Sequence, residues 1–390
     1  MEIVRRVGLK KIIIYISLIV ICLFIWVILI QGPSTIGDMA DDFVGYWTAG
    51  RLLAFQENPY LHDNLIKIHQ DLEFELSAPY PIFYPPPLLP LLIPIGLLAY
   101  PTSRFLWMLL SIFLVFFSGF WAWRVYDGPV RKRWVVILCI LPFAPFYLSL
   151  IEGQITFLIL FGLVGFLYFI KQSKWFLAGL FLTLLLIKFQ LVYLILVAVL
   201  AWIIDKKQWR VLLGLISMTG FLSIISIILR PSIIGDYISF LIHGEPAPCG
   251  FSSLPALFCI FTGGSNQWLR YIPAILGILW GVFYYYRNRM DWIWKDKISL
   301  LIILSVMTAP LAWMHDQLLF IVPILEIGVI IMIDGIDRKD SWIIYLYLII
   351  NIIAIGLIPG FRYRQYIFIW MPIIYLVIYV YSKRNFALKY

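Results

Sequence analysis

Twelve apolar runs, each 13 to 21 residues long, divide almost the whole chain into candidate membrane crossings. A transmembrane helix needs about 20 predominantly apolar residues. The composition agrees, since 63% of the residues are hydrophobic and 13% are charged, against about 25% charged residues in soluble domains. These features exclude a soluble enzyme, a disordered chain and a coiled coil. They predict an all-α polytopic membrane protein, with a single transmembrane domain over residues 1–390 and crossings at 11–30, 104–124, 134–150, 154–170, 175–187, 190–204, 211–229, 268–286, 298–314, 318–333, 341–358 and 366–381.

The positive charges predict how these crossings are oriented. If the N-terminus is cytoplasmic, 22 of the 30 Lys and Arg residues fall in cytoplasmic segments, whereas 31–85 holds two of them against eight acidic residues. Cytoplasmic loops carry an excess of Lys and Arg, so we expect a multi-pass protein of the cell (plasma or inner) membrane with both termini in the cytoplasm. The net charge of +9 then reflects these loops, and no nucleic-acid partner is predicted.

Two long segments are predicted on the extracytoplasmic side, 31–100 and 230–267. Within the first, 61–76 has the pattern of an amphipathic helix at the membrane interface. Residues 86–100 are apolar, but they number only 15 and include four prolines. Counting them as a crossing would move every later loop to the opposite side of the membrane. We therefore interpret them as a re-entrant or interfacial segment. The cysteines are expected to be buried thiols, although Cys249 and Cys259 share one loop and are able to pair.

Three polar tips join pairs of predicted crossings on the extracytoplasmic side: Glu152-Gly153-Gln154, Lys188-Phe189-Gln190 and His315-Asp316-Gln317. Most of the crossings that they join have 17 residues or fewer, so each reaches about 25 Å into a core of about 30 Å. Polar groups at this depth need partners or a water-filled recess. We therefore expect one outward-open cavity; the alternative is a set of ordinary turns in a thinned bilayer.

Three aspartates open the helical stretch at 38–55, namely Asp38, Asp41 and Asp42. Asp38 is placed to be an N-cap, and the helix dipole favours the ionised form of first-turn carboxylates, which suits a general base. Asp42 and Tyr46 share a helix face through their i, i+4 spacing. The aspartates are also able to hold a divalent ion, but no metal-ligand spacing occurs elsewhere, and no metal site is predicted.

An ordered set of motifs runs through the chain. Asp42-Phe43-x-x-Tyr46-Trp47-x-Ala49-Gly50-Arg51 is followed by Asn58-Pro59-Tyr60, Phe83-Tyr84-Pro85-Pro86, Gly153-Gln154, Lys188-x-Gln190 and Ala309-Pro310-x-x-Trp313-x-His315. Over residues 10–380 this order resembles glycosyltransferase family 87 of the GT-C superfamily, whose members include polyprenol-phosphate-mannose-dependent mannosyltransferases. The resemblance implies a GT-C-like bundle of about 12 transmembrane helices, with re-entrant or interfacial helices in the first outer loop.

The same resemblance implies an inverting hexosyltransferase that moves a hexose, with mannose favoured, from a polyprenyl-phosphate donor to a lipid or glycan acceptor on the extracytoplasmic face. The donor is a substrate, so no cofactor is expected, and the remaining partners are membrane lipids. By match to the family's Asp-Phe-x-x-Tyr motif the catalytic base is Asp42, with Asp41 and Asp38 as alternatives. Charge developing on the leaving phosphate needs cationic donors, for which Lys188, His315 and Arg51 are the candidates. The expected substrate cavity is lined by Tyr46, Trp47, Tyr84, Glu152, Gln154, Gln190, Trp313 and Asp316.

Two other interpretations stay open at this point. A polyprenyl-lipid or glycolipid transporter (a flippase) would also be polytopic. Transporters often have paired halves with broken helices at corresponding positions, and no such match is seen between the halves of this chain. A non-catalytic scaffold leaves the polar tips without a role.

Overall fold

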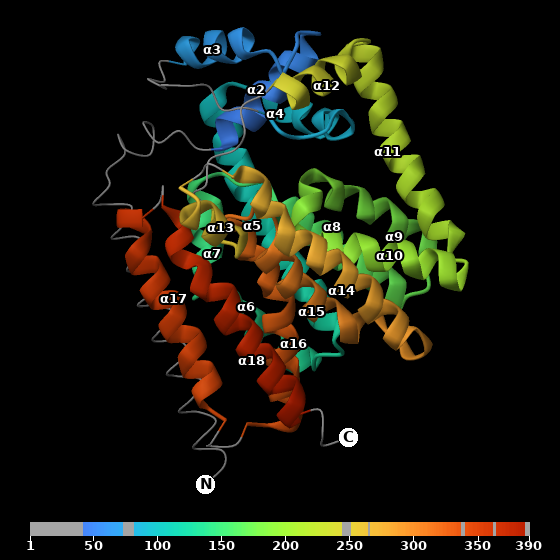
Figure 1. Ribbon diagram of the computed structural model, residues 1–390, viewed down its shortest axis with the longest axis vertical. Coiled ribbons are helices and arrows are strands. Elements are labelled where there is room, and N and C mark those ends of the chain that lie inside the picture. The colour runs from blue at the N-terminus through green and yellow to red at the C-terminus, as the bar shows by residue number, and fades with distance from the viewer. Residues whose placement is uncertain are drawn as a thin grey trace.

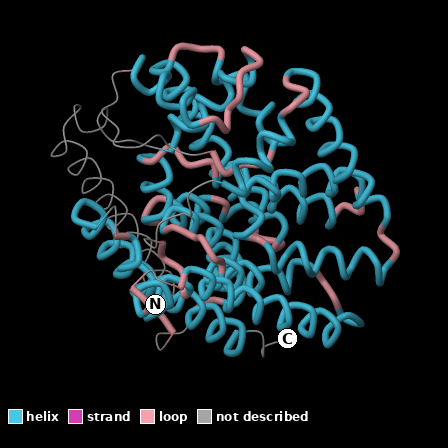
Figure 2. Tube along the Cα trace, turned by 45° about the horizontal axis from the view of Figure 1, so that its top comes forward, coloured by secondary structure: helices cyan, strands magenta, loops and turns pink. Residues whose placement is uncertain are grey.

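The computed structural model describes residues 42–72, 82–243, 251–263, 266–336, 340–361 and 364–386. Every regular element within these ranges is a helix, and the helices are joined by short loops (Figure 2). The predicted all-α class is therefore confirmed for this part of the chain. The predicted crossing at 11–30, together with Asp38 and Asp41, lies outside the described residues.

A small layer of helices, which we call the cap, covers one end of the molecule (top of Figure 1). The amphipathic pattern predicted at 61–76 is visible there in α3, which buries Leu65 and exposes Asp63 and Lys67. The cap consists of α2 (Asp42–Ala54), α3 (His62–Asp71), the 3₁₀ helix η1 (Pro86–Leu92), the short α4 (Ile93–Gly96) and α12 (Ile233–His243).

The remaining helices form the body, most of which lies below the cap in Figure 1, while α11 extends up beside α12. They are α5 (Tyr100–Val125), η2 (Val130–Lys132), α6 (Trp134–Ile140), α7 (Ala144–Ile151), α8 (Thr156–Lys171), α9 (Trp175–Leu182), η3 (Thr183–Leu191), α10 (Tyr193–Lys206), α11 (Trp209–Leu229), α13 (Pro255–Phe261), η4 (Gln267–Tyr271), α14 (Ile272–Asn288), η5 (Arg289–Asp291), α15 (Trp294–Thr308), η6 (Met314–Phe320), α16 (Ile321–Asp334), α17 (Trp342–Phe361), η7 (Gln365–Ile369) and α18 (Trp370–Phe386).

Five of the described helices are long and apolar enough to cross a membrane: α5, α11, η6 with α16, α17, and η7 with α18. A sixth is added if α6 and α7 are one bent span. These helices support a polytopic membrane protein, but they fall short of the predicted twelve crossings. Several predicted crossings correspond to shorter helices, such as α8 with 16 residues and α10 with 14.

The predicted crossing at 134–150 is not one straight helix, because α6 and α7 meet at an angle of 63°. Pro142 and Pro145 explain the break, since proline lacks an N–H and disfavours helical geometry in the residue before it. The backbone N–H of Ala144 at the start of α7 donates to Asn351 Oδ1 on α17 at 2.8 Å, which gives a first-turn N–H the partner that it lacks within its own helix.

Close backbone packing joins α2 to η1 and α4. A Cβ at Gly50 would lie 2.1 Å from Leu92 O, and a Cβ at Gly96 would lie 2.2 Å from Arg51 N. Only glycine fits at these two crossing points. Ten of the 13 residues of α2 are buried, so this helix is a core element, and its packing fixes where Asp42 lies.

Candidate functional site

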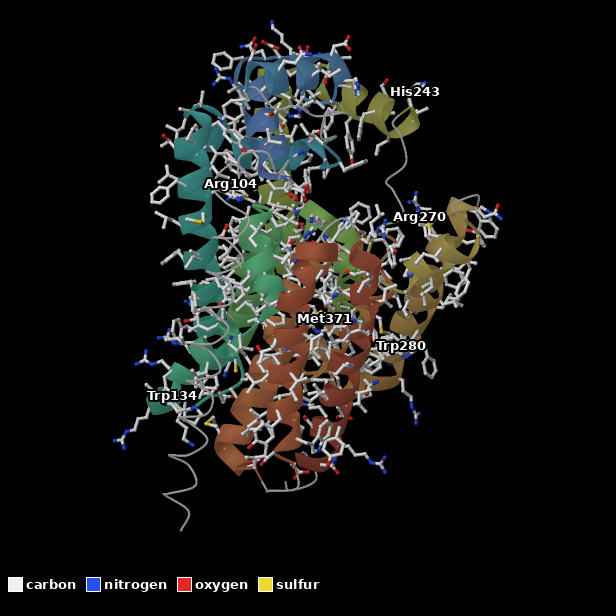
Figure 3. The ribbon with its side chains drawn as sticks, turned by 90° about the vertical axis from the view of Figure 1, so that its left-hand side faces the viewer. Arg104, Trp134, His243, Arg270, Trp280 and Met371 are labelled. Atoms are coloured by element: carbon white, nitrogen blue, oxygen red, sulfur yellow. The ribbon has the colours of Figure 1, made fainter. Side chains whose placement is uncertain are left out.

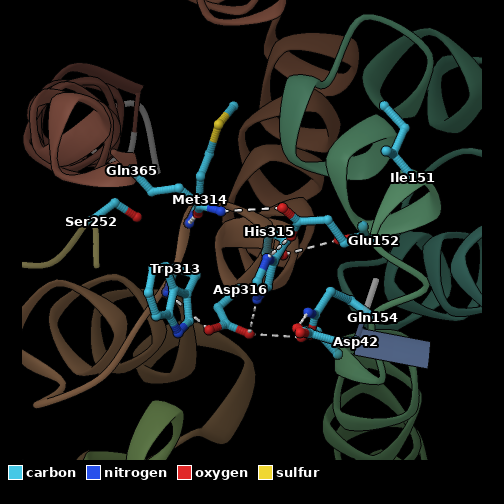
Figure 4. Close-up of polar contacts among 12 residues, drawn as sticks. Asp42, Ile151, Glu152, Gln154, Ser252, Trp313, Met314, His315, Asp316 and Gln365 are labelled. Atoms are coloured by element: carbon cyan, nitrogen blue, oxygen red, sulfur yellow. Dashed lines mark hydrogen bonds and ion pairs between the residues drawn. The ribbon is translucent and has the colours of Figure 1, made fainter. Parts of the chain in front are cut away.

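Polar side chains from five segments meet where the cap joins the body (Figure 4). All of them except Asp42 are buried. We call the set the polar cluster: Asp42 at the start of α2, Glu152 and Gln154 in the turn between α7 and α8, Lys188 in η3, His315 and Asp316 in η6, and Gln365 in η7.

Asp316 is held by three donors. Its Oδ1 accepts hydrogen bonds from Lys188 Nζ at 2.9 Å and from Thr156 Oγ1 at 2.8 Å, and its Oδ2 accepts from the backbone N–H of Trp313 at 3.0 Å. The last contact is part of a capping box at the start of η6. The turn forms there because Ala309 precedes a proline and is extended, which ends α15. Asp316 is thus a buried counter-charge for Lys188.

Gln154 connects this ion pair to Asp42. Its Oε1 accepts from Lys188 Nζ at 2.9 Å and from the Tyr46 hydroxyl at 3.3 Å, and its Nε2 donates to Asp42 Oδ2. A neutral amide is able to do both because it has two donors and an acceptor. The result is a continuous polar connection from Asp42 to Asp316, through Gln154 and Lys188.

His315 is oriented by Glu152. Its Nδ1 is hydrogen-bonded to Glu152 Oε2, and this nitrogen carries a proton because an ionised carboxylate only accepts. Glu152 Oε1 also accepts from Gln365 Nε2 at 3.3 Å. His315 Nε2 has no hydrogen-bond partner among the described residues, and it lies 3.6 Å from Asp316 Oδ1. Lys188 and His315 therefore approach the same oxygen from two segments.

The turn that carries Glu152 and Gln154 is held by α5. Arg104 Nη2 donates to the carbonyl oxygens of Leu150 and Ile151 at 3.0 and 2.8 Å, and Trp107 Nε1 donates to Gly153 O at 2.7 Å. Gly153 has φ +59°, and a Cβ there would lie 2.6 Å from Phe43 Cβ, so glycine is required for both reasons. Arg104 lies at the level where the cap meets the body (Figure 3).

Two tyrosines complete the cap side of the polar cluster. The hydroxyls of Tyr46 and Tyr84 are 2.9 Å apart. Burial raises the pKa of Tyr84 to about 12, and burial together with the neighbouring Tyr84 and Asp42 raises the pKa of Tyr46 well above its usual value. Both phenols are neutral at physiological pH and remain available as hydrogen-bond donors.

Four predicted site residues contribute little to the polar cluster. Arg51 Nη1 donates to Gly96 O at 3.4 Å, and its guanidinium lies over the Trp47 ring, whose Nε1 donates to Leu98 O. Gln190 is half-buried two residues after Lys188. Trp313 contributes its backbone N–H to Asp316, while its ring packs edge-on against Phe251.

The segment 251–263 lies beside the start of η6. The Ser252 backbone N–H donates to Ala312 O at 2.8 Å, and Ser253 Oγ donates to Ala309 O at 2.8 Å. Cys259 in this segment is disulfide-bonded, which corrects the expectation of a buried thiol at that position. Cys249 lies outside the described residues, and Cys139 is free.

Sequence reasoning missed Thr156, Gln365, Arg104 and Trp107. Thr156 follows a predicted tip by two residues, so its place in the sequence was a usable signal. The other three act through contacts with segments at least 46 residues away, which no local pattern reveals. Among the described residues no group of three or more His, Cys, Asp or Glu side chains is arranged to hold a metal ion.

Comparison with known proteins gives one finding. The model of glycosyltransferase family 87 matches residues 82–315, more than half of the chain. The matched region contains Tyr84, Gln154, Lys188 and His315, whereas Asp42 precedes it and Asp316 follows it. No curated protein and no solved structure matches the chain.

Proposed function

The chain belongs to glycosyltransferase family 87, and we propose that it moves a hexose, with mannose as the first candidate, from a polyprenyl-phosphate donor to a lipid or glycan acceptor. It is an integral-membrane glycosyltransferase. In the proposed reaction, of the GT-C type, an acceptor hydroxyl attacks the anomeric carbon with inversion, Asp42 takes the hydroxyl proton, and the polyprenyl phosphate leaves with the electron pair of the broken C–O bond.

The accessibility of Asp42 carries this proposal. Of the three carboxylates in the polar cluster, Glu152 and Asp316 are buried and are held by His315 and Lys188. Asp42 is the one that is only partly buried. A general base must come within hydrogen-bond reach of the hydroxyl that it deprotonates, and among these groups Asp42 is the carboxylate that an incoming acceptor can reach.

Lys188 and His315 are the groups that we propose for the leaving phosphate. Lys188 has three N–H donors, of which two are directed to Gln154 and Asp316; the third has no partner among the described residues. His315 Nε2 is also without a hydrogen-bond partner. Because Asp316 offsets the charge of Lys188, the phosphate would bind in competition with that carboxylate, and Arg51 is proposed only as a more distant contributor.

The side of the membrane on which the site lies is inferred from the positions of the basic residues and of the disulfide-bonded cysteine. Disulfides persist in oxidising compartments, and the segment with Cys259 is hydrogen-bonded to the residues just before η6. The C-terminal ends of α8 and α10 and the turns that follow them carry Lys171, Lys174, Lys206 and Lys207, as the cytoplasmic ends of membrane helices do. We therefore propose an extracytoplasmic site with cytoplasmic termini, in a GT-C-type bundle of about twelve crossings.

The test is a transfer assay in proteoliposomes with polyprenyl-phosphate mannose or polyprenyl-phosphate glucose, scored for a glycolipid product. Asp42→Asn keeps the side-chain shape and removes proton acceptance, so turnover should fall by about 10²–10⁴ while donor binding persists. Asp63→Asn, at an exposed acid of α3, is the matched control and should leave turnover unchanged.

Three results would contradict the proposal. One is normal turnover in Asp42→Asn. Another is the absence of product with every lipid-phosphate sugar. The third is movement of the lipid between leaflets without sugar transfer, which would favour a flippase.

A further inference from the structure

The hydrogen bonds of the polar cluster have directions that follow from the chemistry of its members. Lys188 Nζ only donates, so the Gln154 atom that it contacts at 2.9 Å is the amide oxygen. The amide nitrogen of Gln154 then faces Asp42 Oδ2, which accepts from it. The two neighbours therefore fix which way this amide points.

Tyr46 has one hydroxyl proton and two oxygens beside it. Gln154 Oε1 lies 3.3 Å from the Tyr46 hydroxyl, and the Tyr84 hydroxyl lies 2.9 Å from it. An amide oxygen has no proton to give, and Tyr46 is only 2% exposed. If Tyr46 did not donate to Gln154, two unpaired acceptors would face each other at a buried position, which is costly. The hydrogen bond between the two phenols is therefore donated by Tyr84.

This assignment uses the single proton of Tyr84 and leaves its oxygen as an acceptor. Among the described residues no donor is hydrogen-bonded to that oxygen. Tyr84 is half-buried, and its contact with Tyr46 is partly exposed, whereas the contact of Tyr46 with Gln154 is buried. A ligand group that reaches the Tyr84 oxygen has to bring a proton of its own.

The backbone around Tyr84 is held in place by two parts of the structure. The Tyr84 carbonyl oxygen accepts from the Tyr60 hydroxyl at 2.7 Å. The Pro86 carbonyl oxygen accepts from Ser226 Oγ of α11 at 2.7 Å, and the two prolines that follow Tyr84 restrict φ. The Tyr84 and Tyr46 rings also pack together, with centroids 5.3 Å apart. The acceptor is thus preorganised, as recognition of a single substrate atom requires.

Tyr84 lies close to the ammonium group that we propose for the leaving phosphate. Burial has the largest effect on the pKa of Tyr84, and among the charged side chains Lys188 has the largest, ahead of Asp42 and Asp316. In a polyprenyl-phosphate sugar the hexose is bonded directly to the phosphate. The phosphate diester is ionised and has no proton to donate, so it cannot bind an acceptor, whereas every free hydroxyl of the hexose can.

We propose that Tyr84 accepts a hydrogen bond from one hydroxyl of the donor's hexose and so helps to select the sugar. This inference rests on the proposed function, because it takes the lipid-phosphate sugar as the donor. It divides recognition between two kinds of group: Lys188 and His315 donate to the phosphate, and Tyr84 accepts from the sugar.

The experiment measures binding to the full chain in detergent, by isothermal titration calorimetry, without any transfer step. The ligands are polyprenyl-phosphate mannose, its analogues with one sugar hydroxyl at a time replaced by hydrogen, and polyprenyl phosphate without a sugar. One deoxy analogue should bind the unmodified protein about 2- to 12-fold more weakly than the intact donor, which is the contribution of one neutral hydrogen bond.

Tyr84→Phe removes the acceptor and keeps the ring. It should weaken binding of the intact donor by the same factor, with no further loss for that one deoxy analogue, because the two changes remove one shared contact. Polyprenyl phosphate should bind the variant normally, which also shows that the variant is folded. A deoxyfluoro analogue tests the direction of the bond: it has no proton at the contacted position, so it should bind as weakly as the deoxy analogue.

Tyr126→Phe is the matched control. The Tyr126 hydroxyl forms a buried hydrogen bond with another hydroxyl, Ser299 Oγ, at 3.0 Å. It follows the end of α5, a helix whose other end carries Arg104 beside the polar cluster. This variant should bind every ligand as the unmodified protein does.

Three outcomes would overturn the proposal. One is an unchanged affinity of Tyr84→Phe for the intact donor. Another is an equal loss for the intact donor and for polyprenyl phosphate, which would mean that Tyr84 only supports the fold of the site. The third is a deoxyfluoro analogue that binds as well as the intact donor at the position where the deoxy analogue is weak. If the intact donor does not bind the unmodified protein, the proposed function fails as well; if it binds and Tyr84→Phe changes nothing, only this inference fails.

Discussion

Lys188 Nζ lies 2.9 Å from Asp316 Oδ1, although the two residues are 128 positions apart in the chain. Both side chains are buried. Removing one partner of a buried ion pair leaves an uncompensated charge, which typically costs about 3–5 kcal/mol. The pair therefore stabilises the fold and also takes part in the proposed chemistry. The effect of each variant on stability has to be measured separately from its effect on donor use.

Lys188→Met should lower stability by about 3–5 kcal/mol, and Lys188→Met/Asp316→Asn should recover part of that loss because the unpaired carboxylate is removed. Thermal unfolding in detergent gives both values. The control is Lys171→Met, at a more exposed pair with Asp127, which should cost at most about 1 kcal/mol. Equal losses in the single and the double variant would mean that Asp316 needs no counter-charge.

Once folding is accounted for, donor use should fall about 10- to 100-fold in Lys188→Met, because a charge-assisted hydrogen bond contributes roughly 1.5–3 kcal/mol. His315→Ala should act similarly. The double variant should lose less than the sum of the two, since both groups would contact one phosphate. The measurement is donor affinity and turnover for the singles and the double; fully additive losses would exclude a shared phosphate.

Gln154→Glu should move the acid limb of the rate–pH profile to higher pH. Gln154 donates to Asp42, and glutamate would replace this donor by a like charge, which raises the pKa of a carboxylate by about one unit or more. A base with a higher pKa is deprotonated only at higher pH, so activity at low pH is lost first. Gln190→Glu, at a half-buried position of the same 3₁₀ helix as Lys188, is the control, and an identical shift there would contradict the assignment of Asp42.

The stability of the fold between pH 10 and pH 12 should depend on Tyr84. Its pKa is raised by burial to about 12, above the value near 10 in an unfolded chain. The stability from this group is therefore fully present below pH 10 and is lost as the pH rises from 10 to 12. Tyr84→Phe should show a shallower loss of melting temperature across that interval, while Tyr271→Phe, at an exposed tyrosine, should follow the unmodified protein.

Gly50→Ala should destabilise the cap by about 1–3 kcal/mol, since the new Cβ would lie 2.1 Å from Leu92 O, a backbone atom. Gly235→Ala in α12 meets open space and should be neutral or stabilising, because alanine favours helices over glycine by about 0.5–1 kcal/mol. Thermal unfolding compares the two. A neutral Gly50→Ala would mean that α2 and η1 separate easily.

The sequence predicted the helical class, and it singled out the three polar tips from which most of the polar cluster comes, because these follow from apolar length and isolated polar residues. The pairing of Lys188 with Asp316 was not predictable, since the sequence indicates a separate role for each residue and only tertiary packing brings them together. The bend within residues 134–150 was partly predictable from the sequence. Pro142 and Pro145 are visible in the sequence, but the apolar length alone predicts a continuous crossing there.

The C-terminal helices are part of the site, because they hold α7 in place after its bend from α6. Asn351 on α17 holds the start of α7, and Gln365 in η7 holds Glu152 in the turn after it, yet both residues lie beyond the region that matches the family. Residues 340–386 are therefore not an exchangeable membrane anchor. A chimaera that joined the first 336 residues to the last helices of another protein would have to retain an amide at both positions, or His315 would lose its alignment.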